Sequence, residues 1–384
     1  MALRLGLTSF GGPIAHIGHF RREYVVRRGW LDEAAFADLV ALCQSLPGPA
    51  SSQLGVAIGT RRAGLAGGLA AWLGFTLPSA IALTVLGLLA TGVDVSGAGW
   101  VHGLKLAAVA IVAQAVYAMA RTLATDLPRR LLAVAAAAVA LAWATPFSQV
   151  AIIAAGAVIG WLVLTAPDVP QTTASEARVV SRRTGLIALA GFVVLLVGTP
   201  LARAADGQVA AMVEAYVRAG ALVFGGGHVV LPLLDASVVG PGWVPESAFL
   251  AGYGAAQAVP GPLFTFAAYL GTVAEPEPNG VLGAAIAIVA IFLPGVLLVI
   301  AALPFWDGLR ARPAVRRALG GTNAAVVGLL AAALYSPVWT GSVTAPIDVV
   351  VAAAGLGLLL TGRVPPVVVV VLAAVAGQLL AVVT

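Results

Sequence analysis

The sequence predicts an all-α integral membrane protein made of two homologous halves in an inverted-topology repeat. Of its 384 residues, 60% are hydrophobic and 10% are charged, whereas soluble domains carry about a quarter charged residues. Several apolar stretches reach the roughly 20 residues that a helix needs to span a bilayer. Motifs of the first half recur in order in the second half, and the charges between the apolar segments are mirrored.

The composition excludes several function classes. The basic residues behind the formal net charge of +5 lie in short clusters between apolar segments, as topology signals do, so nucleic-acid binding is not expected. Cys43 is the only cysteine, which excludes an internal disulfide and a cysteine-based metal site. The sequence has no Walker A motif, no nucleophile elbow and no His-Glu-x-x-His motif, so transport driven by its own ATP hydrolysis is not expected.

Internal repeats relate the two halves. The recurring motifs are rich in Gly, Pro and Trp, and the offset between the copies drifts only from about 213 to 218 residues. The main pairs are Leu7–Gly12 with Ala221–Gly226, Gly29-Trp30 with Gly242-Trp243, Pro47-Gly48-Pro49 with Pro260-Gly261-Pro262, Leu77-Pro78 with Leu293-Pro294, and Gly160 with Gly377. Because the order is kept throughout, chance is a poor explanation.

Each half holds six apolar segments. They cover residues 3–20, 36–60, 65–90, 103–123, 129–145 and 147–165 in the first half, and residues 216–234, 248–272, 281–304, 320–339, 347–361 and 365–383 in the second. We therefore expect an N-terminal repeat over 1–166, a linker with one connecting membrane helix over 167–202, and a C-terminal repeat over 203–384.

The loops between the segments carry opposite charge patterns in the two halves. Arg61-Arg62 follow the second segment of the first half, where the second half has Glu275 and Glu277. After the third segment the first half has Asp94, where the second half has the basic run 310–317. This mirrored pattern is typical of an inverted-topology repeat, and it predicts that the basic loops face the cytoplasm.

The charges also predict that some segments do not cross the membrane. The loops at both ends of the second segment of the first half are basic, so this segment should enter and return, turning at Pro47-Gly48-Pro49. The single connecting helix inverts the second half only if each half has an even number of crossings, so the first segment should also be re-entrant. We expect about nine crossing helices and four re-entrant or broken segments. In the alternative model every segment crosses, which violates the positive-inside rule at these loops.

The four Gly/Pro breaks predict a substrate site between the halves. Irregular backbone at membrane depth is tolerated where it lines a cavity or lies inside the protein. The free N–H groups of helix N-termini there suit an anion. The residues expected to bind substrate lie at the breaks or beside them: Ser9, Phe10, Gly11, Gly12, Gln44, Pro47, Gly48, Pro49, Ser51, Ser52, Gln53, Phe224, Gly225, Gly226, Gly227, Gln257, Pro260, Gly261, Pro262 and Thr265.

Several of these residues also have a purely structural interpretation. Ser51 and Ser52 follow a break, and they either cap the new helix or cap it and contact the ligand. Lys105 lies inside an apolar run at the position of Asn323 in the other half, and we include both residues in the substrate site. The alternative for Lys105 is a side chain that extends to the membrane surface.

Histidines are the expected proton carriers, because no carboxylate occupies the centre of a predicted crossing segment. His16 follows the first break, His228 follows the equivalent break of the second half, and imidazole titrates near neutral pH. The alternative for each is a hydrogen-bonded packing residue. His16 and His19 have the spacing of a metal pair, but no third ligand is nearby, so no metal is expected.

Five strings of the sequence carry a resemblance to a known family. They are LRLGLTSFGGPIAHIGHFRREYV at 3–25, WLDEAAFADLVALCQSLPGPASSQLG at 30–55, RRAGLAGGLAAWLGFTLPSA at 61–80, FGGGHVVLPLL at 224–234 and GYGAAQAVPGPLFTFAAYLG at 252–271. The chain resembles the chromate ion transporter (CHR) family over nearly its whole length. The resemblance implies a two-domain, multi-pass inner-membrane protein that expels chromate using the proton motive force. It also implies residues before the first motif, which here begins at Leu3.

Three function classes fit these patterns to different degrees. A transporter of chromate, or of isosteric sulfate, and an anion channel both agree with an inverted repeat, and dependence of flux on a proton gradient separates them. An intramembrane enzyme needs a catalytic cluster at membrane depth, which the sequence does not show, so we expect neither enzymatic activity nor a cofactor. The expected partners are the oxyanion, protons and the lipid bilayer, and a homodimer is left open.

Overall fold

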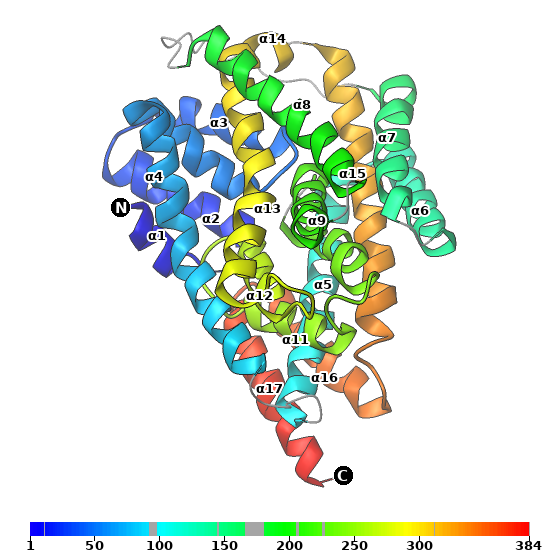
Figure 1. The fold of residues 1–384 in the computed structure, drawn as a ribbon. Helices are drawn as coiled ribbons and strands as arrows, with labels where there is room; N and C mark the ends of the chain where they lie inside the picture. Colours follow the sequence, from blue (N-terminus) through cyan, green and yellow to red (C-terminus); the bar gives the residue numbers. More distant parts are fainter. Residues whose placement is uncertain are drawn as a thin grey trace.

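The computed structural model describes residues 1–10, 12–91, 98–143, 146–165, 180–204, 207–224, 227–310 and 312–383. Within these residues the chain forms helices and no strands, which confirms the predicted all-α class (Figure 1). The predicted site residues Gly11, Gly225 and Gly226 lie outside the described residues, and so does most of the predicted linker. The predicted domain boundaries at 166 and 202 therefore stay predictions.

The helices follow the segments that the sequence predicts. The first half contains α1 (Ala2–Thr8), α2 (Gly12–Phe20), η1 (Arg21–Arg27), α3 (Glu33–Ser45), α4 (Ala50–Thr91), α5 (Gly99–Leu123), α6 (Leu127–Ala142) and α7 (Pro146–Val163), and α8 (Arg182–Ala204) connects it to the second. The second half contains α9 (Gln208–Leu222), η2 (Gly227–Val229), α10 (Val230–Leu234), η3 (Asp235–Val239), α11 (Glu246–Ala256), η4 (Leu263–Thr265), α12 (Phe266–Val273), α13 (Gly280–Ala302), η5 (Leu303–Phe305), α14 (Trp306–Arg310), α15 (Pro313–Ala333), η6 (Leu334–Trp339), α16 (Pro346–Leu360) and α17 (Pro366–Val383).

Helix α4 is a hairpin of two helices. Ala63 and Gly64 have non-helical backbone angles, with φ +65° at Gly64. On either side of this turn the backbones of Gly59 and Gly67 pack so closely that neither position has room for a Cβ. The first part of α4 therefore belongs to the second segment and the rest forms the third, as the sequence predicts.

Among the residues that the structure describes, five helical stretches are long and apolar enough to cross a membrane. They cover Ala50–Thr91, Gly99–Leu123, Arg182–Ala204, Gly280–Phe305 and Pro313–Trp339, and shorter apolar helices accompany them. Large apolar side chains such as Val194 of α8 and Val134 of α6 are exposed on the surface, as contact with lipid requires. The structure thus supports a multi-pass membrane protein, while the number of nine crossings stays a prediction.

The last helix of each half packs along a helix of the other half. Helix α5 of the first half packs along α17 of the second, and α15 of the second half packs along α7 of the first (Figure 1). The backbones touch at Gly103 and Gly377 in one crossing and at Gly321 and Gly160 in the other, because small residues permit close helix approach. Gly103 corresponds to Gly321 in the repeat, and Gly160 corresponds to Gly377. The same pair of repeat positions therefore forms both crossings.

The second segment of each half folds back on itself. In the first half, the guanidinium groups of Arg28 and Arg62 lie 5.5 Å and 5.2 Å from the ring centre of Trp30, one from each end of the segment. In the second half, the Glu275 N–H donates to the Trp243 carbonyl at 2.9 Å. Both ends of each segment therefore meet, which agrees with the predicted hairpin turns at Pro-Gly-Pro.

The first segments also fold back at their breaks. In the second half, Arg218 before the break donates to Ser237 Oγ after it, at 3.4 Å. In the first half, Gly6 of α1 packs against the Phe75 backbone, and His16 of α2 packs edge-on against the Phe75 ring, with 5.4 Å between centroids. Both arms of this segment thus lie at the same level of α4.

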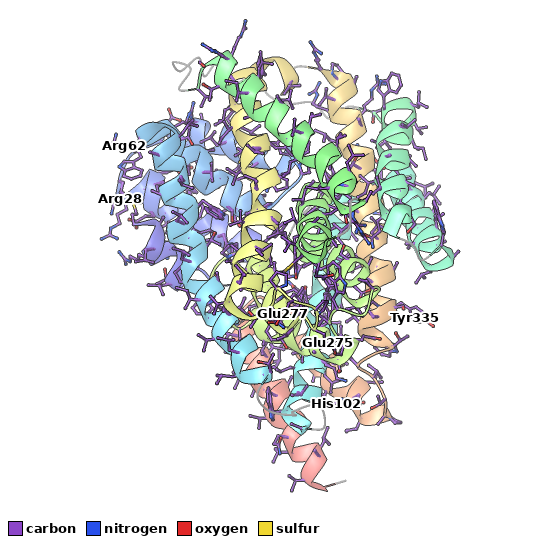
Figure 2. The ribbon with its side chains drawn as sticks, viewed as in Figure 1. Arg28, Arg62, His102, Glu275, Glu277 and Tyr335 are labelled. Carbon is purple, nitrogen blue, oxygen red and sulfur yellow. The ribbon has the colours of Figure 1, made fainter. Side chains whose placement is uncertain are left out.

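The basic and the acidic loops lie at different levels of the molecule. Figure 2 shows Arg28 and Arg62 on the side toward α14 of Figure 1, and Glu275 and Glu277 farther from α14, between the arginines and His102. We refer to these as the basic end and the acidic end. The mirrored charge pattern of the sequence is therefore a spatial separation in the fold.

Candidate functional site

The breaks of the two halves are hydrogen-bonded to each other. The Gly48 N–H donates to the Val223 carbonyl at 2.7 Å, and the Gly261 N–H donates to the Ser9 carbonyl at 2.9 Å. In both cases the glycine of a Pro-Gly-Pro break meets the residue just before a Phe-Gly-Gly break of the other half. The structure therefore brings the four breaks together between the halves.

The local sequence explains the shape of the Pro-Gly-Pro breaks. Gly48 and Gly261 have φ values of +121° and +111°, which only glycine adopts without strain. The flanking prolines have no N–H and so end the helical hydrogen bonding. Gly48 also packs against Gly295, where an added Cβ would lie 3.0 Å from the Gly295 Cα. The breaks are therefore both kinked and tightly packed.

Gln53 fixes the first Pro-Gly-Pro break to the other half. Its Nε2 donates to the Pro47 carbonyl at 2.8 Å and to the Gly295 carbonyl at 3.1 Å. Both amide hydrogens are therefore committed, and the buried Oε1 has no partner among the described residues. We expected Gln53 to bind the substrate, but in this structure it has no donor left for an oxyanion. Its repeat position is Phe266, so only one half has this bridge.

Ser9 and His16 form the polar part of the first break. The Ser9 carbonyl accepts a second hydrogen bond, from His16 Nε2 at 3.1 Å, which assigns the proton of the neutral ring to Nε2. His16 is 1% exposed and Ser9 is fully buried. Neither His16 Nδ1 nor Ser9 Oγ has a partner within the described residues.

His228 occupies the equivalent region of the second half. Its Nδ1 lies 2.9 Å from the hydroxyl of Tyr253 on α11, one helical turn before Gln257. A Cβ on Gly12 would lie 3.8 Å from His228 Nε2, so this histidine faces the break of the first half. The structure thus places both predicted histidines beside the breaks, in hydrogen-bonded positions.

Buried polar atoms without a partner gather around the breaks. Within the described residues they include Ser9 Oγ, His16 Nδ1, Ser52 Oγ, Gln53 Oε1 and Gln257 Nε2. A buried polar group left unpaired costs roughly 1–3 kcal/mol. The two hydroxyls and the Gln257 amide are donors, and the first N–H groups of α4 have no acceptor within the helix. Together they suit a ligand with several acceptor oxygens.

The other predicted residues at the breaks are placed in different ways. Ser51 is buried in the first turn of α4, and the Thr265 hydroxyl donates to the Pro262 carbonyl at 2.7 Å. Gln44 is exposed near the end of α3, and Phe10 is 36% exposed. The side chains of Gln44 and Phe10 thus lie outside the buried polar cluster. The remaining described positions, Pro47, Pro49, Phe224, Gly227 and Pro260, are buried or half-buried parts of the breaks.

Lys105 and Asn323 do not lie at the breaks. Lys105 Nζ donates to the Gly341 carbonyl at 3.3 Å, in the loop after η6. Asn323 lines a separate cavity of about 620 Å³ together with Asp38, Arg129 and Trp306. Although the two positions correspond in the repeat, the inversion places them in different parts of the fold.

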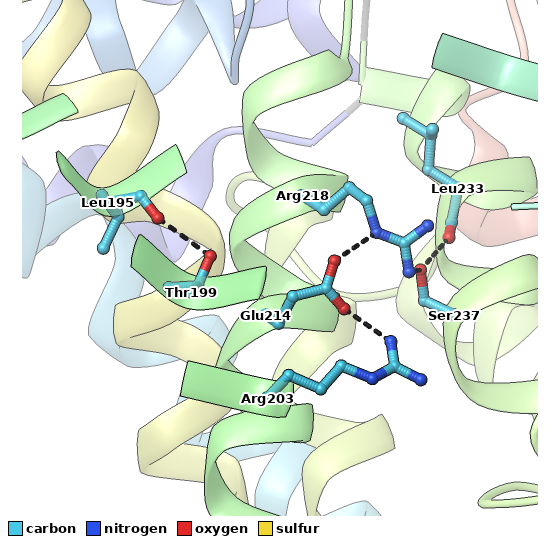
Figure 3. Close-up of polar contacts among 7 residues, drawn as sticks. All are labelled: Leu195, Thr199, Arg203, Glu214, Arg218, Leu233 and Ser237. Atoms are coloured by element: carbon cyan, nitrogen blue, oxygen red, sulfur yellow. Dashed lines mark hydrogen bonds and ion pairs between the residues drawn. The ribbon is translucent and has the colours of Figure 1, made fainter. Parts of the chain in front are cut away.

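Sequence reasoning missed a buried carboxylate in α9. Glu214 is 5% exposed and binds Arg203 of α8 at 2.8 Å and Arg218 at 2.7 Å (Figure 3). The Glu214–Arg218 spacing of four residues is a sequence signal for a helical ion pair, but no signal pointed to Arg203. Within the described residues, no three His, Cys, Asp or Glu side chains come close enough to hold a metal ion.

Comparisons with known proteins agree with the two-half architecture. The chromate transporter family model matches residues 1–161 and 210–378. A chromate transport protein of Pseudomonas aeruginosa is 31% identical over 345 residues, which is 86% of this chain and 78% of that protein. A chromate transport protein of Cupriavidus metallidurans is 26% identical over 339 residues, or 86% and 80% of the two chains.

A more distant relative is an uncharacterized transporter of Methanocaldococcus jannaschii. It is 23% identical over 341 residues, which is 86% of this chain and 81% of that protein. No solved structure matches the chain significantly. The two regions that the family model matches contain the four breaks, helices α5 and α15, and most of α7 and α17, and on this basis the chain belongs to the chromate transporter family.

Proposed function

We propose that this protein is a secondary transporter that exports chromate across the inner membrane, from the basic end to the acidic end. Family membership supports chromate transport across a membrane. The observation that carries the mechanism is the cluster of unpaired neutral donors where the four breaks meet. Sulfate has the same shape and charge as chromate, and it is the alternative substrate.

Neutral donors suit a transported dianion. Hydrogen bonds to a charged ligand contribute roughly 1.5–3 kcal/mol each, so the hydroxyls of Ser9 and Ser52 and the first amides of α4 can hold an oxyanion together. Fixed cations would retain the ligand more strongly and slow its release. Lys105 lies away from the breaks, which leaves the described cluster without a lysine or arginine side chain bound to it.

The direction of transport follows from charge. Basic loops face the cytoplasm, so the Arg28 and Arg62 end is proposed to be cytoplasmic and the Glu275 and Glu277 end external. Moving one elementary charge through 100 mV changes the free energy by about 2.3 kcal/mol, and a dianion moves two. A membrane potential that is negative inside therefore drives chromate outward, as one component of the proton motive force.

Two histidines are proposed to couple the transport to protons. His16 Nδ1 is buried beside Ser9 without a partner among the described residues, and His228 is hydrogen-bonded to Tyr253. Imidazole exchanges protons near neutral pH, and both rings lie beside the breaks. The packing of Gly48 on Gly295 supports an alternating mechanism over an open channel, because it leaves no room for a side chain at this break.

Uptake of labelled chromate into inside-out membrane vesicles tests this proposal. Vesicles that contain the protein should accumulate chromate when energised, and should stop when an ionophore removes the membrane potential and the proton gradient. Sulfate and molybdate, added as competitors, define the substrate class. Chromate flux that persists unchanged without either gradient would support the channel, and absence of flux in energised vesicles would contradict the proposal.

A further inference from the structure

The repeat positions Arg21 and Asp235 have opposite charges. Arg21 is the first residue of η1 and Asp235 is the first residue of η3, and each follows the arm that leaves a Phe-Gly-Gly break. Their partners correspond as well, because Glu33 begins α3 and Glu246 begins α11. The same two positions of the repeat therefore hold one basic and one acidic residue at the basic end, and two acidic residues at the acidic end.

At the basic end this pair is neutral. Arg21 Nε donates to Glu33 Oε2 at 2.9 Å, and both side chains are more than half exposed. Arg27 and Arg28 bind Glu23 at 3.2 Å and 2.8 Å. Glu23 and Glu33 are therefore each bound to a guanidinium group, and the third carboxylate of this turn, Asp32, accepts the Ala35 N–H as the cap of α3.

At the acidic end the equivalent pair lines a cavity of about 810 Å³. Asp235 and Glu246 both lie on its wall, together with Gln149 and Ser148 from the first half. Asp235 Oδ1 is buried and has no hydrogen-bond partner within the described residues. In place of an ion pair, this cavity therefore has two carboxylates facing one space.

The arginines of the same cavity do not balance these carboxylates. Arg203 and Arg218 also line it, but both are bound by the buried Glu214, as Figure 3 shows. Asp235, Glu246 and Glu214 supply three carboxylates, and Arg203 and Arg218 supply two guanidinium groups. Among the described residues at this cavity, carboxylates are therefore in excess. An excess of carboxylates on the wall of one cavity disfavours the binding of an anion there.

We propose that Asp235 and Glu246 make this cavity the release side for the oxyanion, because they lower its affinity there relative to the basic end. This inference rests on the proposed function and on its orientation. An oxyanion that leaves the breaks toward the acidic end meets negative charge and dissociates, and an oxyanion outside is hindered from binding. The neutral Arg21–Glu33 pair presents no such barrier on the other side.

Chromate exchange measured separately from each side of oriented proteoliposomes tests this inference. Asp235→Asn and Glu246→Gln should each lower the half-saturating chromate concentration at the acidic end by about tenfold, which corresponds to about 1.4 kcal/mol. The half-saturating concentration at the basic end should not change, and it serves as the internal control for folding. Asp235→Glu keeps the charge and should behave like the wild type.

The matched control lies at the other end of the repeat. Glu33→Gln removes the partner of Arg21 and leaves a positive charge, so it should lower the half-saturating concentration at the basic end only. If Asp235→Asn and Glu246→Gln change neither side, or change both sides equally, the inference is wrong although transport stands. If the wild-type protein exchanges no chromate from either side, the proposed function itself is wrong.

Discussion

Single hydroxyl groups define the centre of the proposed site. Ser9 and Ser52 are buried beside two different breaks, and neither hydroxyl oxygen has a partner within the described residues. The sequence could predict both residues, because each lies next to a Gly/Pro break. It could not show that Gln53 is committed to the Gly295 carbonyl, because that acceptor is 242 residues away in the chain. Residue types indicate a site, whereas hydrogen-bond partners decide which of them stay available.

The serines should contribute to affinity without contributing to stability. Ser9→Ala and Ser52→Ala each remove one donor to a charged ligand, which is worth roughly 1.5–3 kcal/mol. We expect the half-saturating chromate concentration to rise about tenfold or more, at about 1.4 kcal/mol per decade, with unchanged protein levels. Thr272→Val is the control, since the Thr272 hydroxyl is also buried but donates to the Ala268 carbonyl. If both serine variants bind chromate with wild-type affinity, the binding site lies elsewhere in the protein.

Gln53 and Gln44 should differ in their effects on stability. Gln53→Leu removes the hydrogen bond to the Gly295 carbonyl and leaves the Pro47 carbonyl without its donor, at a cost of roughly 1–3 kcal/mol for an unpaired buried group. We expect a clearly lower melting temperature of the detergent-solubilised protein. Gln44→Leu changes an exposed side chain near the same break and should melt like the wild type. Equal melting temperatures of the two variants would show that the Gln53 bridge does not hold the break.

At the scale of the elements, the breaks were predictable and their partners were not. Gly and Pro at the same repeat positions predicted four interruptions, and the structure has helix ends at each of them. The packing of α5 along α17 and of α15 along α7 depends on contacts between distant segments, for which the local sequence has no signal. For the same reason the sequence could not show that Lys105 and Asn323, which we included in the substrate site, bind or line other regions.

The Pro-Gly-Pro break should tolerate no side chain at its centre. Gly48→Ala introduces a Cβ at φ +121° and places it 2.9 Å from Gln53 Nε2 and 3.0 Å from Gly295 Cα. We expect loss of transport and a lower melting temperature. Gly64→Ala is the control, because φ is +65° there but no atom lies within 4 Å of the added Cβ. It should cost only the backbone strain of this glycine-favoured conformation, roughly 1–3 kcal/mol, and transport should persist. Equal behaviour of the two variants would contradict the role of packing at the break.

At the scale of the whole molecule, the two ends differ in charge, and the first and second segments of each half are predicted to return to the end they start from. Labelling of single cysteines from outside the cell tests this orientation. The natural Cys43 is 1% exposed, and replacing it by serine removes its background. Glu275→Cys should react with an impermeant reagent, whereas Arg62→Cys and Asp32→Cys should react only after permeabilisation. Reaction of Arg62→Cys from outside would reverse the orientation, and different sides for positions 32 and 62 would mean that the second segment crosses.

The central claim is that the four breaks form an oxyanion site, and equilibrium binding of labelled chromate to the purified protein tests it most directly. The wild-type protein should bind chromate saturably, sulfate should compete for the same site, and the combined Ser9→Ala and Ser52→Ala variant should bind at least about a hundredfold more weakly, as two independent losses of 1.4 kcal/mol or more predict. Unchanged binding by that variant, in protein that melts like the wild type, would contradict the account.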